Sequence, residues 1–166
     1  LVENTFDSFH DSWSEIGSTP LNEFYGSGKL EVLITDLSGR VQLNALVDSS
    51  GKAQGDKAAL TRELLKRILE SGDVGDLEVE EITLILDAIT DWIDKDDQEV
   101  GIDQTESSYY FSLSPSYDCR NGPLEFLEEI LLIRGITEQL YYGTDEYVGL
   151  RDLVTVHGND GRVNIN

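Results

Sequence analysis

The stretch that decides the fold covers residues 91–106 and reads DWIDKDDQEVGIDQTE. It sets seven carboxylates against a single lysine, Lys95. Side chains of like charge packed this densely repel one another unless water screens them or a cation bridges them. Closely spaced carboxylate oxygens, with a glycine for a sharp bend, are also the ligands that calcium selects. The run is therefore either a solvated acidic loop or a calcium-binding loop.

An EF-hand is the obvious calcium motif to compare with this run. If Asp94 takes the first position, Asp96 fits the third. Glu99 then falls where the glycine belongs, and Thr105 stands where the bidentate glutamate is required. The ligand chemistry suits calcium but the EF-hand loop is absent. Any site must be irregular, and Glu106 could close it from the far side.

Apolar residues recur at helical spacing on the N-terminal side of the run, and two amphipathic helices are predicted there. The second leads directly into the acidic run, and Ser71-Gly72 ends the first. The apolar faces are Leu60, Leu64, Leu65, Ile68 and Leu69 for the first helix, and Val79, Ile82, Ile85, Leu86, Ile89, Trp92 and Ile93 for the second.

A third helix is predicted on the C-terminal side, opening at Pro123 and ending at Gly135. Its inward residues are expected to be Leu124, Leu127, Ile130 and Leu131. A short helix over residues 137–142 follows. The region from about residue 57 to 150 thus reads as a compact helical unit.

Strand patterns flank this helical region on both sides. Residues 29–35 and 41–45, around a turn at 37–39, predict a β-hairpin, and residues 154–156 and 163–165 predict another. The expected fold class is α+β, with three regions: residues 1–48 with the first hairpin, an all-α insertion over 49–152, and a return segment over 153–166.

The charge of the chain restricts its partners. Thirty-three acidic residues against 12 basic ones give a net charge of -21. Such a surface repels phosphate backbones and anionic headgroups, and it attracts divalent cations or basic partners. No apolar run approaches the ~20 residues that span a bilayer. Because the chain contains no methionine, we expect it to be an excised segment of a longer protein.

Enzymatic motifs are not found in the sequence. The patterns G-x-x-x-x-G-K-[ST] and G-x-S-x-G do not occur, and neither histidine stands at a metal-ligand spacing. The single cysteine, Cys119, excludes an intrachain disulfide. We therefore expect a protein that is not an enzyme.

Residues 127–137 support an alternative from another class, because helix, Gly-Ile, helix is the order of helix-hairpin-helix nucleic-acid modules. Such modules present basic side chains to phosphate, whereas the neighbours here are acidic. Those neighbours are Glu125, Glu128, Glu129, Glu138, Asp145 and Glu146. Nucleic-acid binding is accordingly the disfavoured alternative.

Several segments, in order, resemble the K-type minor pseudopilin family of the bacterial type II secretion system, general secretion pathway protein K. They are ITDLSGRVQLNAL at 34–46, DWIDKD at 91–96 with Glu106 and Tyr109-Tyr110 beyond it, NGPL at 121–124, EEILLIRGIT at 128–137, YV at 147–148 and VNIN at 163–166. The chain departs from the family at Gln104-Thr105, where the family often has Gly-Ala, and at Cys119 and Arg120, where it commonly has small residues.

The resemblance implies a pilin-like α/β body into which a large all-α domain is inserted, with an N-terminal membrane helix missing from this segment. It implies a structural role at the tip of the periplasmic pseudopilus, on the periplasmic face of the inner membrane. The expected partners are the I-type and J-type minor pseudopilins, not nucleic acid. Membrane attachment is expected only through the missing helix.

Some members of this family bind calcium in the inserted domain, so the resemblance also implies Ca²⁺ as a cofactor here. On that basis the acidic run is expected to hold the ion between its two ends. The expected ligands are Asp91, Asp94, Asp96 and Glu106, with Asn121 as a further oxygen donor.

Overall fold

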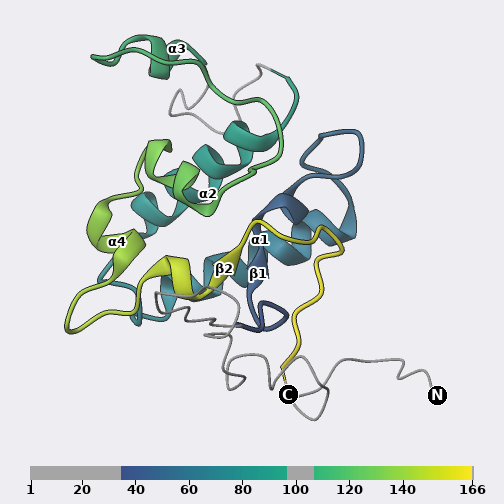
Figure 1. The fold of residues 1–166 in the computed structure, drawn as a ribbon, viewed down its shortest axis with the longest axis vertical. Helices are drawn as coiled ribbons and strands as arrows, with labels where there is room; N and C mark the ends of the chain where they lie inside the picture. The colour runs from purple at the N-terminus through teal and green to yellow at the C-terminus, as the bar shows by residue number, and fades with distance from the viewer. Residues whose placement is uncertain (1–34, 97–106, 166) are drawn as a thin grey trace, which may run out of the picture. The chain divides into compact units, whose positions relative to one another are not determined.

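The computed structural model describes residues 35–96 and 107–165. The chain divides into two compact units, Leu1–Asp36 and Leu37–Asn166, and the elements below belong to the second. It is a mixed fold of helices and one small sheet (Figure 1). The domain boundaries predicted after residues 48 and 152 remain a prediction.

The longest elements are the two helices that lead to the acidic run. They are α1, Gly55–Glu70, and α2, Val79–Ile93. Helix α1 ends where predicted, since Gly72 has a φ of 78°, which glycine adopts without strain. A capping box starts α2, in which the Glu78 amide donates to the Glu81 carboxylate at 2.9 Å. Both predicted helices are confirmed.

The two helices bury apolar faces against each other and against the rest of the unit. Leu65 and Leu69 of α1 are inaccessible or nearly so, as are Ile85 and Ile89 of α2. Two residues of the predicted apolar faces are not buried, because Leu60 is 55% exposed and Val79 is 65% exposed. Both lie in the N-terminal half of their helices, away from the middle of the packing face.

The sheet consists of two very short parallel strands, β1 (Val41–Gln42) and β2 (Val154–Thr155). Val41 pairs with Val154, so segments far apart in sequence lie side by side (Figure 1). The predicted hairpin over residues 154–156 and 163–165 is therefore wrong, whereas the pairing within the first predicted hairpin is not tested. The first arm of the first hairpin, over residues 29–34, lies outside the described residues.

The predicted strand over residues 41–45 turns into a 3₁₀-helix, Leu43–Leu46, after two residues. Its residues Leu43, Ala45 and Leu46 are all buried. An alternating strand would place Ala45 and Leu46 on opposite faces. A turn of three residues instead brings Leu43 and Leu46 to one side, so the tighter helix buries more apolar surface.

The predicted third helix is also a 3₁₀-helix, Leu127–Leu132, and is shorter than expected. Leu124 before this helix and Ile130 within it are buried, and Ile133 and Ile136 beyond its end continue the spacing of three residues from Ile130. A spacing of three residues matches the 3₁₀-helix, which has three residues per turn. It does not match the α-helix, which has 3.6 residues per turn. The short helices α3 (Ser107–Phe111) and α4 (Glu138–Tyr142) complete the unit, with a 3₁₀ turn at Leu150–Asp152.

The C-terminal segment follows β2 without forming a strand. The side chain of Gln42 donates to Asp160 Oδ1 at 2.9 Å and to the Arg162 carbonyl at 3.1 Å, and it accepts from the Gly161 amide at 3.1 Å. The side chain of Gln42 thus holds the C-terminal segment, in place of the main-chain hydrogen bonds of the predicted hairpin.

Candidate functional site

The C-terminal end of α2 buries carboxylates that the sequence assigned to a metal loop. Asp91 is fully buried, and Asp94 is 3% exposed. Asp96 is partly buried, and the chain beyond it lies outside the described residues until α3 begins at residue 107. Ionised carboxylates are rarely buried without compensation, which makes this end of α2 the candidate site.

Asp94 carries the strongest electrostatic signal of the site. Burial, with additional repulsion from Asp96 and Asp91, raises the pKa of Asp94 to about 7. Its Oδ1 atom is buried and has no hydrogen-bond partner among the described residues. A bound cation would reverse both effects, because it favours the ionised carboxylate and satisfies its lone pairs.

Asn121 reaches the same region from a separate segment. Its Nδ2 donates to the main-chain carbonyl oxygen of Asp96 at 3.1 Å. Its Oδ1 is buried and, within the described part of the chain, likewise lacks a partner. Asn121 has a φ of 47°, a left-handed conformation that asparagine tolerates better than most residues. Two oxygens without partners, on Asp94 and Asn121, are hard donors of the kind that calcium binds.

The turn that presents Asn121 is held by a neighbouring ion-pair cluster. Arg120 donates to Glu129 at 2.8 Å, to Glu125 at 2.7 Å and to the Pro123 carbonyl at 2.6 Å. The other oxygen of Glu129 accepts the amides of Glu125 and Phe126, at 2.8 and 2.7 Å. Arg120 and Glu129 therefore fix the backbone on both sides of the turn. No local sequence pattern indicated this pair.

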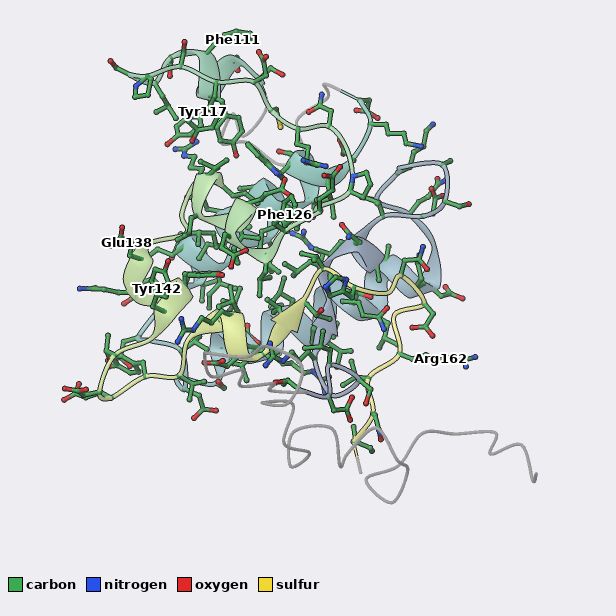
Figure 2. The ribbon with its side chains drawn as sticks, viewed as in Figure 1. Phe111, Tyr117, Phe126, Glu138, Tyr142 and Arg162 are labelled. Carbon is green, nitrogen blue, oxygen red and sulfur yellow. The ribbon has the colours of Figure 1, made fainter. Side chains whose placement is uncertain are left out.

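An aromatic cluster joins the two ends of the acidic run. Trp92 of α2 packs edge-to-face on Tyr110 of α3, with ring centroids 5.0 Å apart, and Tyr117 lies 5.4 Å from Tyr110. The Tyr117 hydroxyl donates to the Leu132 carbonyl at 2.7 Å. Figure 2 shows Tyr117 beside α3, on the side that faces the rest of the unit. Such pairs add about 0.5–1.5 kcal/mol beyond their burial, so they hold α2 and α3 against each other.

The structure thus brings four of the five predicted ligands to one region, and the fifth, Glu106, lies outside the described residues. Within residues 35–96 and 107–165, no three side chains of His, Cys, Asp or Glu converge as a metal-binding group. The donors present fit calcium in type, whereas a complete ligand set would need residues from 97–106. The metal assignment therefore stays a prediction.

The turn at Gly135, which suggested a nucleic-acid module, packs against α2. A Cβ atom at Gly135 would lie 3.0 Å from Ile85 Cγ1. The Arg134 guanidinium lies 4.6 Å from the centre of the Tyr109 ring. The elements on either side are the 3₁₀-helix Leu127–Leu132 and α4, so the predicted pair of α-helices is not formed. The turn therefore has a packing role.

Within the described residues, no helix is both long enough and apolar enough to cross a lipid bilayer.

Comparison with solved structures identifies a protein of the same fold. A chain in the crystal structure of the GspK-GspI-GspJ complex from the enterotoxigenic Escherichia coli type 2 secretion system matches with a TM-score of 0.55 at 22% identity. The match covers 68% of this chain and 38% of that one.

Curated relatives carry a single name, type II secretion system protein K. The Aeromonas hydrophila protein is 32% identical over 73% of this chain, and the Pseudomonas aeruginosa protein is 27% identical over 99% of it. These matches cover only 37% and 45% of the relatives' own lengths.

The family model for type II secretion system protein K matches residues 39–152, a span that holds both strand β1 and the candidate site. That span is well over half of the chain. The chain therefore belongs to the type II secretion system protein K family.

Proposed function

We propose that this chain is part of a minor pseudopilin that assembles with the I-type and J-type minor pseudopilins and caps the tip of the periplasmic pseudopilus. Membership of the protein K family carries the proposal. The fold match to a chain in a GspK-GspI-GspJ complex supports the choice of partners. The role is structural, on the periplasmic face of the inner membrane.

The strand pairing supports a helical domain inserted into a pilin-like body. Strands β1 and β2 lie next to each other, while all four α-helices of the described residues fall between them in sequence. A segment that leaves and returns at adjacent strands can be accommodated without disturbing the sheet that it leaves. A bulky insertion of this kind would block the addition of further subunits above it.

Calcium is the second part of the proposal. The buried Oδ1 atoms of Asp94 and Asn121 lack partners among the described residues, and Asp91 and Asp96 add negative charge nearby. Glu106 would complete the site. A bound ion would join α2 to the Asn121 turn and neutralise the repulsion around Asp94. Calcium at ~100 times its dissociation constant would stabilise the fold by ~2.7 kcal/mol.

Co-expression with the I-type and J-type partners of the same organism tests the assembly role. The intact protein should co-purify with both as one complex on size-exclusion chromatography. Elution apart from an otherwise intact I–J pair would reject it. Capping is tested in cells that overproduce the major pseudopilin, because loss of a true cap should lengthen the filaments.

Isothermal titration of chelator-treated protein with calcium tests the metal, with magnesium as the control ion. Binding of calcium with a raised melting temperature is expected. A melting temperature that calcium does not change would remove the metal from the proposal and leave the assembly role standing.

A further inference from the structure

A cavity of about 610 Å³ has neither Asp94 nor Asn121 in its wall, although Ile93 and Lys95, on either side of Asp94, line it. The buried apolar side chains of Val47, Ile93 and Val156 form part of its wall. Two lysines also line it, Lys57 from α1 and Lys95 from the segment after α2. Apolar walls combined with a few charged groups are typical of a binding pocket.

Glycines in left-handed conformations make room for both lysine side chains. A Cβ atom at Gly51, which has a φ of 80°, would lie 2.5 Å from Cγ and Cδ of Lys95. A Cβ atom at Gly161, with a φ of 70°, would lie 2.8 Å from Cγ of Lys57. Each aliphatic stem therefore runs close to a glycine, where a larger residue would displace it. Lys57 is half-buried, so its stem is restrained and loses less entropy when its ammonium group binds a ligand, whereas Lys95 is exposed.

The two ammonium groups keep donors available. Lys57 Nζ donates to the Asn159 carbonyl at 2.8 Å, which uses one of its three protons. Neither lysine forms an ion pair within the residues that the structure describes. By contrast, Lys66 and Arg67 of α1 are both paired with glutamates. Two lysines that form no ion pair among the described residues thus line one cavity.

Asp48, also on the cavity wall, restricts which anion would fit. Hydrogen bonds from Ser50, Gln54 and Lys52 hold the pKa of Asp48 well below its usual range, so its carboxylate is charged at neutral pH. A phosphate dianion would meet this negative charge. A single carboxylate on an aliphatic stem would meet less repulsion and could place the stem against the apolar wall.

We propose that this cavity binds an aspartate or glutamate side chain of another polypeptide between Lys57 and Lys95. The chain as a whole repels acidic partners, because its net charge is -21. Binding must then come from the two local ammonium groups. The inference goes beyond the proposed function and does not depend on calcium.

The test uses the intact protein at a fixed calcium concentration and a short capped peptide that contains glutamate. Binding is followed by fluorescence polarisation of the labelled peptide and by NMR shifts of the Lys57 and Lys95 side-chain signals. Lys57→Gln and Lys95→Gln keep most of each stem and remove the charge. Each should weaken binding about tenfold or more, as expected for a charge-assisted hydrogen bond. Lys66→Gln is the control, because Lys66 is on α1 but pairs with Glu70.

Three outcomes would overturn the proposal. One is equal binding of a matched peptide with glutamine in place of glutamate, and another is unchanged affinity in both lysine variants. The third is phosphate binding as tightly as the peptide. Gly51→Ala gives a second measurement, since it should displace Lys95 and weaken binding while Lys57 remains in place. Assembly with the I-type and J-type pseudopilins is measured in a separate experiment. A loss of peptide binding can therefore be distinguished from a loss of assembly.

Discussion

Asn121 donates a hydrogen bond through Nδ2 to the main-chain oxygen of Asp96 at 3.1 Å. This contact links the turn before the 3₁₀-helix Leu127–Leu132 to the segment that enters the acidic run. Asn121 Oδ1 is buried and has no hydrogen-bond partner among the described residues. The side chain of Asn121 therefore connects the two segments through Nδ2 and offers Oδ1 as an oxygen at the candidate site.

Replacing Asn121 separates these two roles. Asn121→Gly keeps the left-handed backbone and removes the amide, so it should cost about 1 kcal/mol of unfolding free energy in chelator. Asn121→Ala should cost roughly 1–2 kcal/mol more, because alanine is strained at positive φ. If Asn121 is a ligand, both variants should also lose much of the stabilisation by calcium. Urea unfolding with and without calcium measures both effects.

The raised pKa of Asp94 predicts how stability depends on pH in the absence of calcium. The folded protein releases this proton near pH 7, whereas an aspartate in the unfolded chain releases it near about pH 3.9. Between these values the folded state holds more protons, so raising the pH should destabilise the calcium-free fold. The contribution of Asp94 is fully present in acid and is lost as the pH rises through the folded pKa.

Asp94→Asn is the matched variant, because it removes the titration and keeps the shape. Unfolding free energies in chelator at about pH 5 and about pH 7.5 should differ less in the variant than in the wild type. If Asp94 binds calcium, the ion should stabilise the wild type more at the higher pH. An identical pH dependence in the two proteins would show that Asp94 titrates normally.

The sequence predicts the helices α1 and α2 well and the short elements poorly. Sixteen and 15 residues give the 3.6 repeat enough turns to be recognised. The strands β1 and β2 have two residues each and pair in parallel across most of the chain. No local pattern encodes such a pairing. The 3₁₀-helices Leu43–Leu46 and Leu127–Leu132 are predicted as a strand and an α-helix, because four and six residues are too few to distinguish a repeat of three from a repeat of 2 or 3.6.

The candidate site was predictable in its residue types and less so in its geometry. The density of negative charge points to Asp94 and Asp96, and the family resemblance points to Asn121. The pair Arg120–Glu129, which holds the Asn121 turn, could not be found in this way. The two residues are nine positions apart, and most of the chain between them is not helical. No periodic pattern in the sequence therefore indicates that they form a salt bridge.

Asn44 should contribute substantially to stability, because one side chain bridges three segments. Its Nδ2 donates to the carbonyls of Leu124 and Val156, at 3.0 and 2.8 Å, and its Oδ1 accepts from the Leu124 amide at 2.8 Å. Asn44→Ala would leave these part-buried groups without partners, at a cost of about 1–3 kcal/mol for an unsatisfied group. Chemical denaturation measures the loss.

Asn159→Ala is the control for Asn44→Ala. Asn159 is exposed, and its contact with Lys57 uses only its main-chain oxygen. Its replacement should change stability by less than about 0.5 kcal/mol. Equal effects at the two positions would mean that the bridge formed by Asn44 is not a major source of stability.

The last prediction concerns the coupling between Arg120 and Glu129. Their side chains are 28% and 15% exposed, and both also bind main-chain groups around the Asn121 turn. A double-mutant cycle with Arg120→Gln and Glu129→Gln should give a coupling energy of about 1–2 kcal/mol, within the range for contacting residues in one network. Each single variant should also weaken calcium binding, because the turn that presents Asn121 would loosen.

Arg67 and Glu63 of α1 supply the reference pair for this cycle. Their side chains lie 2.9 Å apart at i,i+4 spacing and are 71% and 48% exposed. Water screens such a pair, so its coupling should be only about 0.3–0.5 kcal/mol and should leave calcium affinity unchanged. If the Arg120–Glu129 coupling is no larger than this, the turn is held by its backbone alone. Asn121 would then be positioned by its own hydrogen bond to Asp96.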